Sequence, residues 1–473
     1  MSCVIAEVQT LTTTSAQRPK GRTRKSNKID DGSLSRARLA RRHDGGQKQL
    51  LCGTLPEHDV LDTQMFAVFY DNFLPPLLSP WRSVSYLASV AGTVPGTPLL
   101  KSAKRAFGLV HLAQQSQNTA ILQESRISYG RLLGLLNYAL QCPDKEIRDI
   151  LVTMSLMTHM SNTMELAAQK DVTWAVHLQA AQHLLMLQGP RHLQVESAVD
   201  QGIVRHICGN SFWLAIANRR GWSIHRAWLK MQTKGWADML EVFHDLPTIL
   251  QDTDATFARE DNIGDLLKLV SRLHHTTKFA RSLFTTVQDR PIVGISELKK
   301  GGIKDKDRLL AAGSYIFSGW YAPMNQMDAL KFILMTLLSL ITECTILRIW
   351  IMCPETVMLI PSDLQRSIYQ NSDRLARRLC RISPSLMQAD GIVSVLTLEL
   401  CLRMAYNVFE QQQATAERNW SSAALSATSK RLDLVRANGV PTLCKLEQVI
   451  PGIVEAGRYG SAFDLRALTL SIA

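Results

Sequence analysis

The chain has 473 residues, of which 46% are hydrophobic, and its formal net charge is +12 at pH 7. Residues 18–48 alone hold eleven Lys and Arg against three Asp, so the rest of the chain is close to neutral. This distribution excludes a globally basic surface that wraps nucleic acid, and the length suffices for one large core or two moderate ones.

The N-terminal residues 1–55 are rich in Ser, Thr, Gly and Arg without sustained apolar periodicity, so we expect a basic arm that is disordered when unbound. The arm has the spacing of a bipartite nuclear import signal, and weak, sequence-independent contact with DNA phosphates is a second interpretation. A solvated tail with no partner is the third. The candidate residues for import or phosphate contact are Arg22, Arg24, Lys25, Arg36, Arg38, Arg41 and Arg42.

Targeting and membrane signals are weak in this sequence. The first residues lack a charged start followed by an apolar run, which argues against a secretory signal. The most apolar stretch, residues 332–342, lies between Lys331 and Glu343 and would rise only ~16 Å as a helix, so we expect a buried core helix and no membrane partner. The nine cysteines are scattered without a C-x-x-C pair, as in intracellular proteins with reduced thiols.

Helical periodicity starts near residue 56 and continues with short breaks. A helix led by Tyr129 is predicted over residues 129–140, and Asp144 is expected to cap the next helix. A third helix is predicted from Trp174 onward, and Gly189-Pro190 ends it. Its apolar stripe consists of Trp174, Leu178, Ala181 and Leu185.

The longest internal polar stretch, residues 288–308, predicts a loop between two helical halves at 56–287 and 309–473. Strand patterns are sparse, and no repeat of fixed period stands out. The expected fold class is therefore all-α.

The order of these segments resembles the middle homology region of fungal zinc-cluster transcription factors. In that family a Tyr-led helix ending near a Pro-Asp turn precedes a helix patterned Trp-x-x-His-x-x-small, which closes on Gly-Pro. The resemblance covers most of residues 56–450, with alanine at a position where family members usually have glycine. The matching positions are Tyr129, Pro143, Asp144, Trp174, His177, Ala180, Gly189 and Pro190.

Members of that family bind DNA through six clustered cysteines that hold two zinc ions, whereas here Cys3 and Cys52 are the only cysteines before Cys142. The resemblance therefore implies a nuclear transcription regulator, of a fungal secondary-metabolite gene cluster, that lacks its own DNA reader. Its partners would be other transcription factors or the transcription machinery, with a small-molecule effector as a further option. A sequence whose first exons are missing would give the same pattern.

No catalytic motif stands out: HExxH, G-x-S-x-G, a P-loop and G-x-G-x-x-G are all absent, so we expect no cofactor, and an enzyme is disfavoured. The adjacent pair His274 and His275 would diverge on a helix and would not chelate one ion. His177 is interpreted as hydrogen-bonded within a helix interface.

Four tryptophans either line a pocket for an apolar ligand or serve as helix packing. They are Trp213, Trp222, Trp228 and Trp236. The rival function is a helical enzyme or small-molecule-binding protein of secondary metabolism derived from such a regulator.

Overall fold

The structure is a computed structural model that describes residues 97–437 and Val454, except for short internal segments. The excepted segments are 117, 142, 166–172, 190–196, 232–233, 260–262, 284–291, 294–303, 322–325 and 389–391. The predicted basic arm, with all seven of its candidate residues, lies outside the described residues. Helices account for 87% of the interpretable region, and its strands are two short ones, which confirms the all-α fold class.

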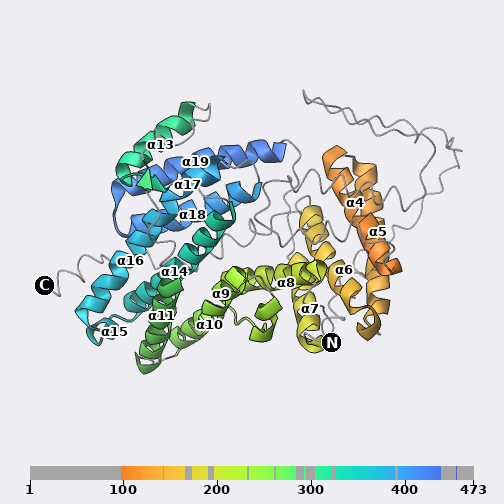
Figure 1. Ribbon diagram of the computed structural model, residues 1–473, viewed down its shortest axis with the longest axis horizontal. Helices are drawn as coiled ribbons and strands as arrows, with labels where there is room; N and C mark the ends of the chain where they lie inside the picture. The colour runs from red at the N-terminus through yellow and green to blue at the C-terminus, as the bar shows by residue number, and fades with distance from the viewer. Residues whose placement is uncertain are drawn as a thin grey trace, which may run out of the picture.

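The N-terminal helices lie at one end of the molecule and the C-terminal helices at the other, with α8 to α10 between them and α11 beside α14 and α15 (Figure 1). The N-terminal part contains α4 (Pro98–Ser116), α5 (Thr119–Ala139), α6 (Pro143–Glu165), α7 (Thr173–Gln188) and α8 (Ala198–Ala217). The middle contains the 3-10 helix η4 (Arg226–Met231), α9 (Lys234–Val242), α10 (Leu246–Phe257) and α11 (Ile263–Leu283). The C-terminal part contains β1 (Ile292–Val293), α13 (Lys304–Ile316), β2 (Trp320–Tyr321), α14 (Gln326–Met352), α15 (Glu355–Met358), α16 (Ser362–Arg381), α17 (Ser383–Gln388), α18 (Ile392–Gln411) and α19 (Thr415–Ala437).

The second helix of the N-terminal part, α5, begins with a side-chain cap. Asn118 Oδ1 accepts hydrogen bonds from the backbone N–H groups of Ala120 and Ile121 at 2.9 and 3.3 Å. These are two of the N–H groups that a helix start leaves without an intrahelical partner. The cap fixes where α5 begins, and its buried face then carries Leu132 and Leu136.

Helix α6 begins at Pro143, and Asp144 lies in its first turn. Proline suits the first helical position, because its φ is already helical and its missing N–H has no intrahelical partner there. The expectation that Asp144 is the N-cap is therefore wrong by two residues. The apolar face that helical spacing predicts for this helix is confirmed, since all of its residues are buried: Ile147, Ile150, Leu151, Met154 and Met157.

The predicted stripe of α7 is confirmed, since all four of its residues are buried. Gly189 follows α7 at φ +70°, a left-handed conformation that glycine adopts without steric conflict. Its N–H donates to Leu185 O at 3.2 Å and closes the helix end as expected.

Helix α14 contains the apolar stretch 332–342 but continues ten residues further, because Glu343 and Arg348 are part of the helix and do not bound it. Lys331–Met352 is long and apolar enough to cross a membrane by length and composition only. Its most apolar window is 94% buried inside the structure, as in the core helix of a globular protein. The core-helix prediction is confirmed, and the expected length was too short.

Part of the segment 288–308, expected to be a loop, has regular structure. β1 pairs antiparallel with β2, with Ile292 opposite Tyr321, and α13 starts at Lys304. The backbone pairing ties this segment to the C-terminal helices.

A cluster of aromatic rings fixes α13 against α19. Trp420 Nε1 donates to Leu309 O at 2.9 Å, and the Phe317 ring meets Trp420 edge-on at 4.9 Å between centroids. Gly313 permits this approach, since a methyl group there would overlap the indole rings of Trp320 and Trp420.

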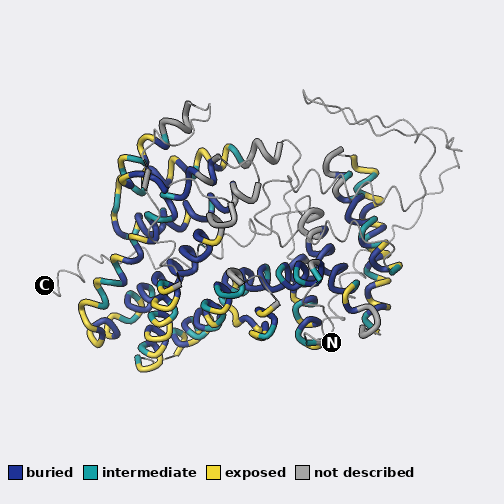
Figure 2. The backbone as a smooth tube through the Cα atoms, viewed as in Figure 1, coloured by how far each residue is buried: buried dark blue, intermediate teal, exposed yellow. Residues whose placement is uncertain are grey.

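The two predicted halves share one hydrophobic core. Helix α11, from the first half, packs on α14 from the second, and α10 also contacts α14. Buried residues run through α8 and α14 in Figure 2, whereas the ends of α11 and the α15 region are exposed. The surface between α9 and α11 is therefore held by a continuous scaffold.

Candidate functional site

The motif residues Tyr129 and His177 come together, although they lie on different helices. Tyr129 Oη and His177 Nε2 are 2.5 Å apart, and this hydrogen bond joins α5 to α7. Burial lowers the pKa of His177 to about 4, so the ring is neutral at pH 7. In the tautomer that carries its proton on Nδ1, the ring accepts a hydrogen bond from the Tyr129 hydroxyl at Nε2. The interpretation of His177 as a hydrogen-bonded interface residue is confirmed.

Two further motif residues, Trp174 and Ala180, lie where helices pack against one another. Trp174 is 1% exposed in the core, and Ala180 is half-buried where α7 meets the other helices. Pro190 lies outside the described residues. The described motif side chains on α5 and α7 thus contribute to helix packing.

Three of the four candidate pocket tryptophans are core residues. Trp213, Trp222 and Trp228 are buried, and the Trp222 indole N–H donates to Ser211 Oγ at 2.9 Å. The side chain of Trp236 lies outside the described part. None of the three described tryptophans lines the cavity described next, so the packing alternative accounts for them.

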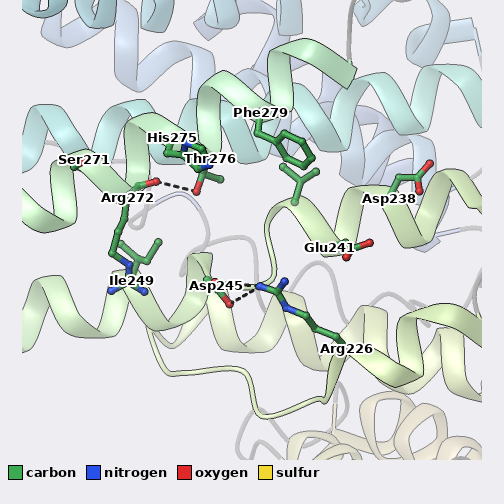
Figure 3. Close-up of a pocket in the computed structure, with 11 residues that line it drawn as sticks. Arg226, Asp238, Glu241, Asp245, Ile249, Ser271, Arg272, His275, Thr276 and Phe279 are labelled. Carbon is green, nitrogen blue, oxygen red and sulfur yellow. Dashed lines mark hydrogen bonds and ion pairs between the residues drawn. The ribbon is translucent and has the colours of Figure 1, made fainter.

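A cavity of about 730 Å³ lies between α9, the start of α10 and α11, and we call it the α9–α11 groove (Figure 3). Its walls come from η4 and α9 on one side and α11 on the other. The residues that line it are Arg226, Asp238, Glu241, Val242, Asp245, Ile249, Ser271, Arg272, His275, Thr276 and Phe279.

The floor of the groove is held by a charged network around Asp245. The Arg226 guanidinium lies 3.2 Å from Asp245 Oδ2, and His244 Nδ1 lies 2.8 Å from Oδ1. Burial acts to raise the pKa of Asp245, but the hydrogen bond from His244 and the charge of Arg226 outweigh it and hold the pKa below its ordinary value. Asp245 therefore stays ionised and keeps Arg226 in place.

Two further carboxylates, Asp238 and Glu241, are three residues apart on α9 and occupy the same face. Neither side chain makes a hydrogen bond or ion pair with the residues that the structure describes. On the opposite wall, Ser271, His275 and Phe279 follow one another at four-residue steps along α11. The Phe279 ring is half exposed and points from α11 toward α9 (Figure 3). The groove thus offers spare negative charge beside an accessible aromatic ring.

Two arrangements common in catalytic sites were sought among the described residues of the groove. The described residues contain no group of three or more His, Cys, Asp or Glu that could hold a metal ion. Ser271 and His275 make no hydrogen bond to each other in the described structure, so a nucleophile activated by a base is missing there. As expected, His274 and His275 diverge, and only His275 reaches the groove.

Sequence reasoning did not identify this groove. The four-residue spacing of Ser271, His275 and Phe279 was the available signal, because it mixes one exposed aromatic residue into a polar face. The spacing of Asp238 and Glu241 does not predict a site, since acidic residues three apart are common on solvated helix faces.

Comparison with known protein families, with curated proteins and with solved structures finds no match to this chain.

Proposed function

We propose that the protein is a transcription regulator that acts through its helical body by contact with another protein. The order of the motif segments and the missing six-cysteine cluster support regulation of a secondary-metabolite gene cluster without an intrinsic zinc-dependent DNA reader. The observation that carries the protein-contact part is the α9–α11 groove, which lies open between two helices, with two acids on one wall that pair with no other described residue.

The groove fits a basic amphipathic segment of a partner protein. Lys or Arg side chains would pair with Asp238 and Glu241, and charge complementarity of this kind steers association and fixes orientation. An apolar or cationic side chain of the same segment would rest on the Phe279 ring. A helix laid in such a groove presents side chains at the three- and four-residue spacing that both walls share.

The test is complementation of a deletion strain of the source organism. The wild-type chain should accumulate in the nucleus and restore the transcripts lost on deletion. The double charge reversal Asp238→Lys, Glu241→Lys should enter the nucleus at the same level but fail to restore them. A matched double reversal at exposed acids elsewhere, Glu124→Lys with Asp363→Lys, should restore them fully.

Two outcomes would overturn the proposal. A wholly cytosolic protein whose deletion changes no transcript removes the regulatory role. Full complementation by the Asp238→Lys, Glu241→Lys variant removes the groove as the partner site.

The rival, a small-molecule binder or enzyme, has one observation in its favour, because about 730 Å³ lies within the range of small-ligand pockets. The charged lining and the absence of an activated nucleophile among the described residues favour the regulator. Conversion of a pathway intermediate by the purified chain would support the enzyme hypothesis.

A further inference from the structure

Helix α16 carries arginines in two electrostatic situations. Arg377 is matched by two carboxylates, with Asp373 Oδ2 at 2.9 Å and Glu417 Oε1 at 2.7 Å. Arg374 and Arg378 have no carboxylate within 4.0 Å among the described residues. Among the described residues, these two cations, one turn apart on α16, therefore have no carboxylate in salt-bridge contact.

A third arginine approaches from α11 over a buried acid. Arg281 Nη2 donates to Glu343 Oε1 at 2.9 Å, and the Glu343 side chain is 0% exposed. Its second oxygen, Oε2, accepts no hydrogen bond of standard geometry from the described residues. Arg374 Nη2 donates to Asn371 Oδ1 at 2.6 Å, which holds that guanidinium beside the pair.

The Arg374 guanidinium is repelled by two other arginines, Arg378 one turn along α16 and Arg281 on α11. Burial lowers the pKa of Arg374 first, and the charges of Arg378 and Arg281 lower it further. Burial also raises the pKa of Glu343 to about 7, although Arg281, Arg374 and the Asn371 amide oppose that rise. Arg281 and Arg374 thus face a single carboxyl group that is only partly ionised at pH 7, and Arg378 lies one turn along α16 from Arg374.

The positive charge of this cluster is open to solvent. The Arg281 side chain is 33% exposed and Arg374 is exposed, whereas Glu343 lies beneath them. Lys278, exposed on α11, adds a fourth cation near the same end. Desolvation and the charges of Arg281 and Lys278 also lower the pKa of His274, so the histidine stays neutral beside them.

We propose that Arg281, Arg374 and Arg378 form a binding site for the oxyanion of a small metabolite, a carboxylate or phosphate group. Guanidinium groups present paired N–H donors that match both anions, and a site with excess cations gains most from a doubly charged ligand. Glu343 is a positioning residue that orients Arg281 from below. The site is separate from the α9–α11 groove and does not depend on the proposed function.

The test is binding of inorganic phosphate, sulfate and citrate to the purified full chain, by calorimetry at constant ionic strength. The Arg374→Gln, Arg378→Gln double variant should bind at least about tenfold more weakly, as expected for the loss of charged hydrogen bonds. Arg366→Gln, on the same helix and paired with Asp363 at 3.7 Å, is the matched control and should bind like the wild type. Tighter binding of citrate would indicate a carboxylate ligand, and tighter binding of phosphate would indicate a phosphate ligand.

The opposite change gives an independent readout. Glu343→Gln removes the carboxylate that lies beneath Arg281 and Arg374, so anion binding at pH 8 should become tighter by a few-fold. The proposal is overturned if no anion binds saturably, or if the double variant binds as well as the wild type. It is also overturned if duplex DNA binding is lost in the double variant while small-anion binding is unchanged.

Discussion

Two buried ionisable side chains in different regions of the molecule are held in opposite ways. His177, between α5 and α7, meets the uncharged phenol of Tyr129, and burial keeps it neutral with a pKa of about 4. Glu343, on α14, meets the guanidinium of Arg281, and burial raises its pKa to about 7. The N-terminal region buries a neutral pair, whereas the C-terminal region buries a charged one.

This difference indicates in which region stability depends on charge. Removing one member of a neutral pair leaves one unsatisfied polar atom, whereas removing the cation of a buried ion pair leaves a charge with no compensation. We therefore expect the C-terminal region to respond more strongly to single substitutions and in the opposite direction to pH.

The largest expected effect is that of Arg281→Met. It leaves the Glu343 carboxyl buried without its cation, so at pH 8, where that carboxyl is mostly ionised in the wild type, the free energy of unfolding should fall by about 3–5 kcal/mol. Urea unfolding followed by circular dichroism measures this. The control is Arg272→Met on the same helix, which breaks an exposed pair with Asp252 and should lose less than about 1 kcal/mol. Equal losses would break the comparison.

The pH response should have opposite signs in the two regions. For Glu343 the folded pKa of about 7 lies above its ordinary 4.5, so its contribution is complete below pH 4.5 and is lost as pH rises to 7. For His177 the folded pKa of about 4 lies below its ordinary 6.5, so its contribution is complete above pH 6.5 and is lost as pH falls to 4. Each change amounts to roughly 3 kcal/mol.

Amide hydrogen exchange, corrected for intrinsic rates, separates these two responses. Protection of α14 should fall between pH 5 and 8, and protection of α7 should fall between pH 6.5 and 4. Glu343→Gln should flatten the first response, since Arg281, Arg374 and Asn371 would then face a group that does not titrate. Parallel responses in both helices would contradict the assignment.

A packing change tests the C-terminal region without altering its charge. Gly313→Ala forces a methyl into the Trp320 and Trp420 rings and should destabilise the protein by about 2 kcal/mol. Gly134→Ala, in α5, meets nothing within 4 Å and should stabilise it by up to about 1 kcal/mol. Thermal unfolding compares them, and Gly313→Ala should leave the pH response of α14 unchanged.

The smallest expected effect is that of Tyr129→Phe. It leaves His177 Nε2 without its phenol partner and should lower the free energy of unfolding by about 1–2 kcal/mol. Tyr138→Phe on the same helix changes an exposed ring and should be neutral. A loss as large as that of Arg281→Met would show that neutral and charged pairs matter equally here.

The fold class and the helix faces were predictable from the sequence because apolar periodicity reports burial directly. The stripe of α7, its end at Gly189 and the apolar face of α6 all follow from spacing alone. The His177 interface also followed, since a histidine beside an apolar stripe needs a partner when it is buried.

The sequence-based predictions were least accurate where a charged residue lies inside a buried helix. Glu343 marked the expected end of an apolar segment, yet it is buried in the middle of α14, because Arg281 from α11 supplies its counter-charge. The α9–α11 groove was unpredictable for a related reason. Asp238 and Phe279 face the same space only because α9 and α11 pack on a common scaffold, and no local pattern encodes that packing.

The burial of α14 has a consequence for how the chain is synthesised. Helices α10 and α11 leave the ribosome before α14, but α16 and α18, which also pack on it, leave afterwards. The apolar surface of α14 that packs against α16 and α18 therefore stays exposed until these helices are translated. Exposed apolar surfaces of this kind bind chaperones or aggregate. Nascent chains arrested soon after Met352 should accordingly be the most chaperone-dependent, and recombinant fragments ending there the least productive.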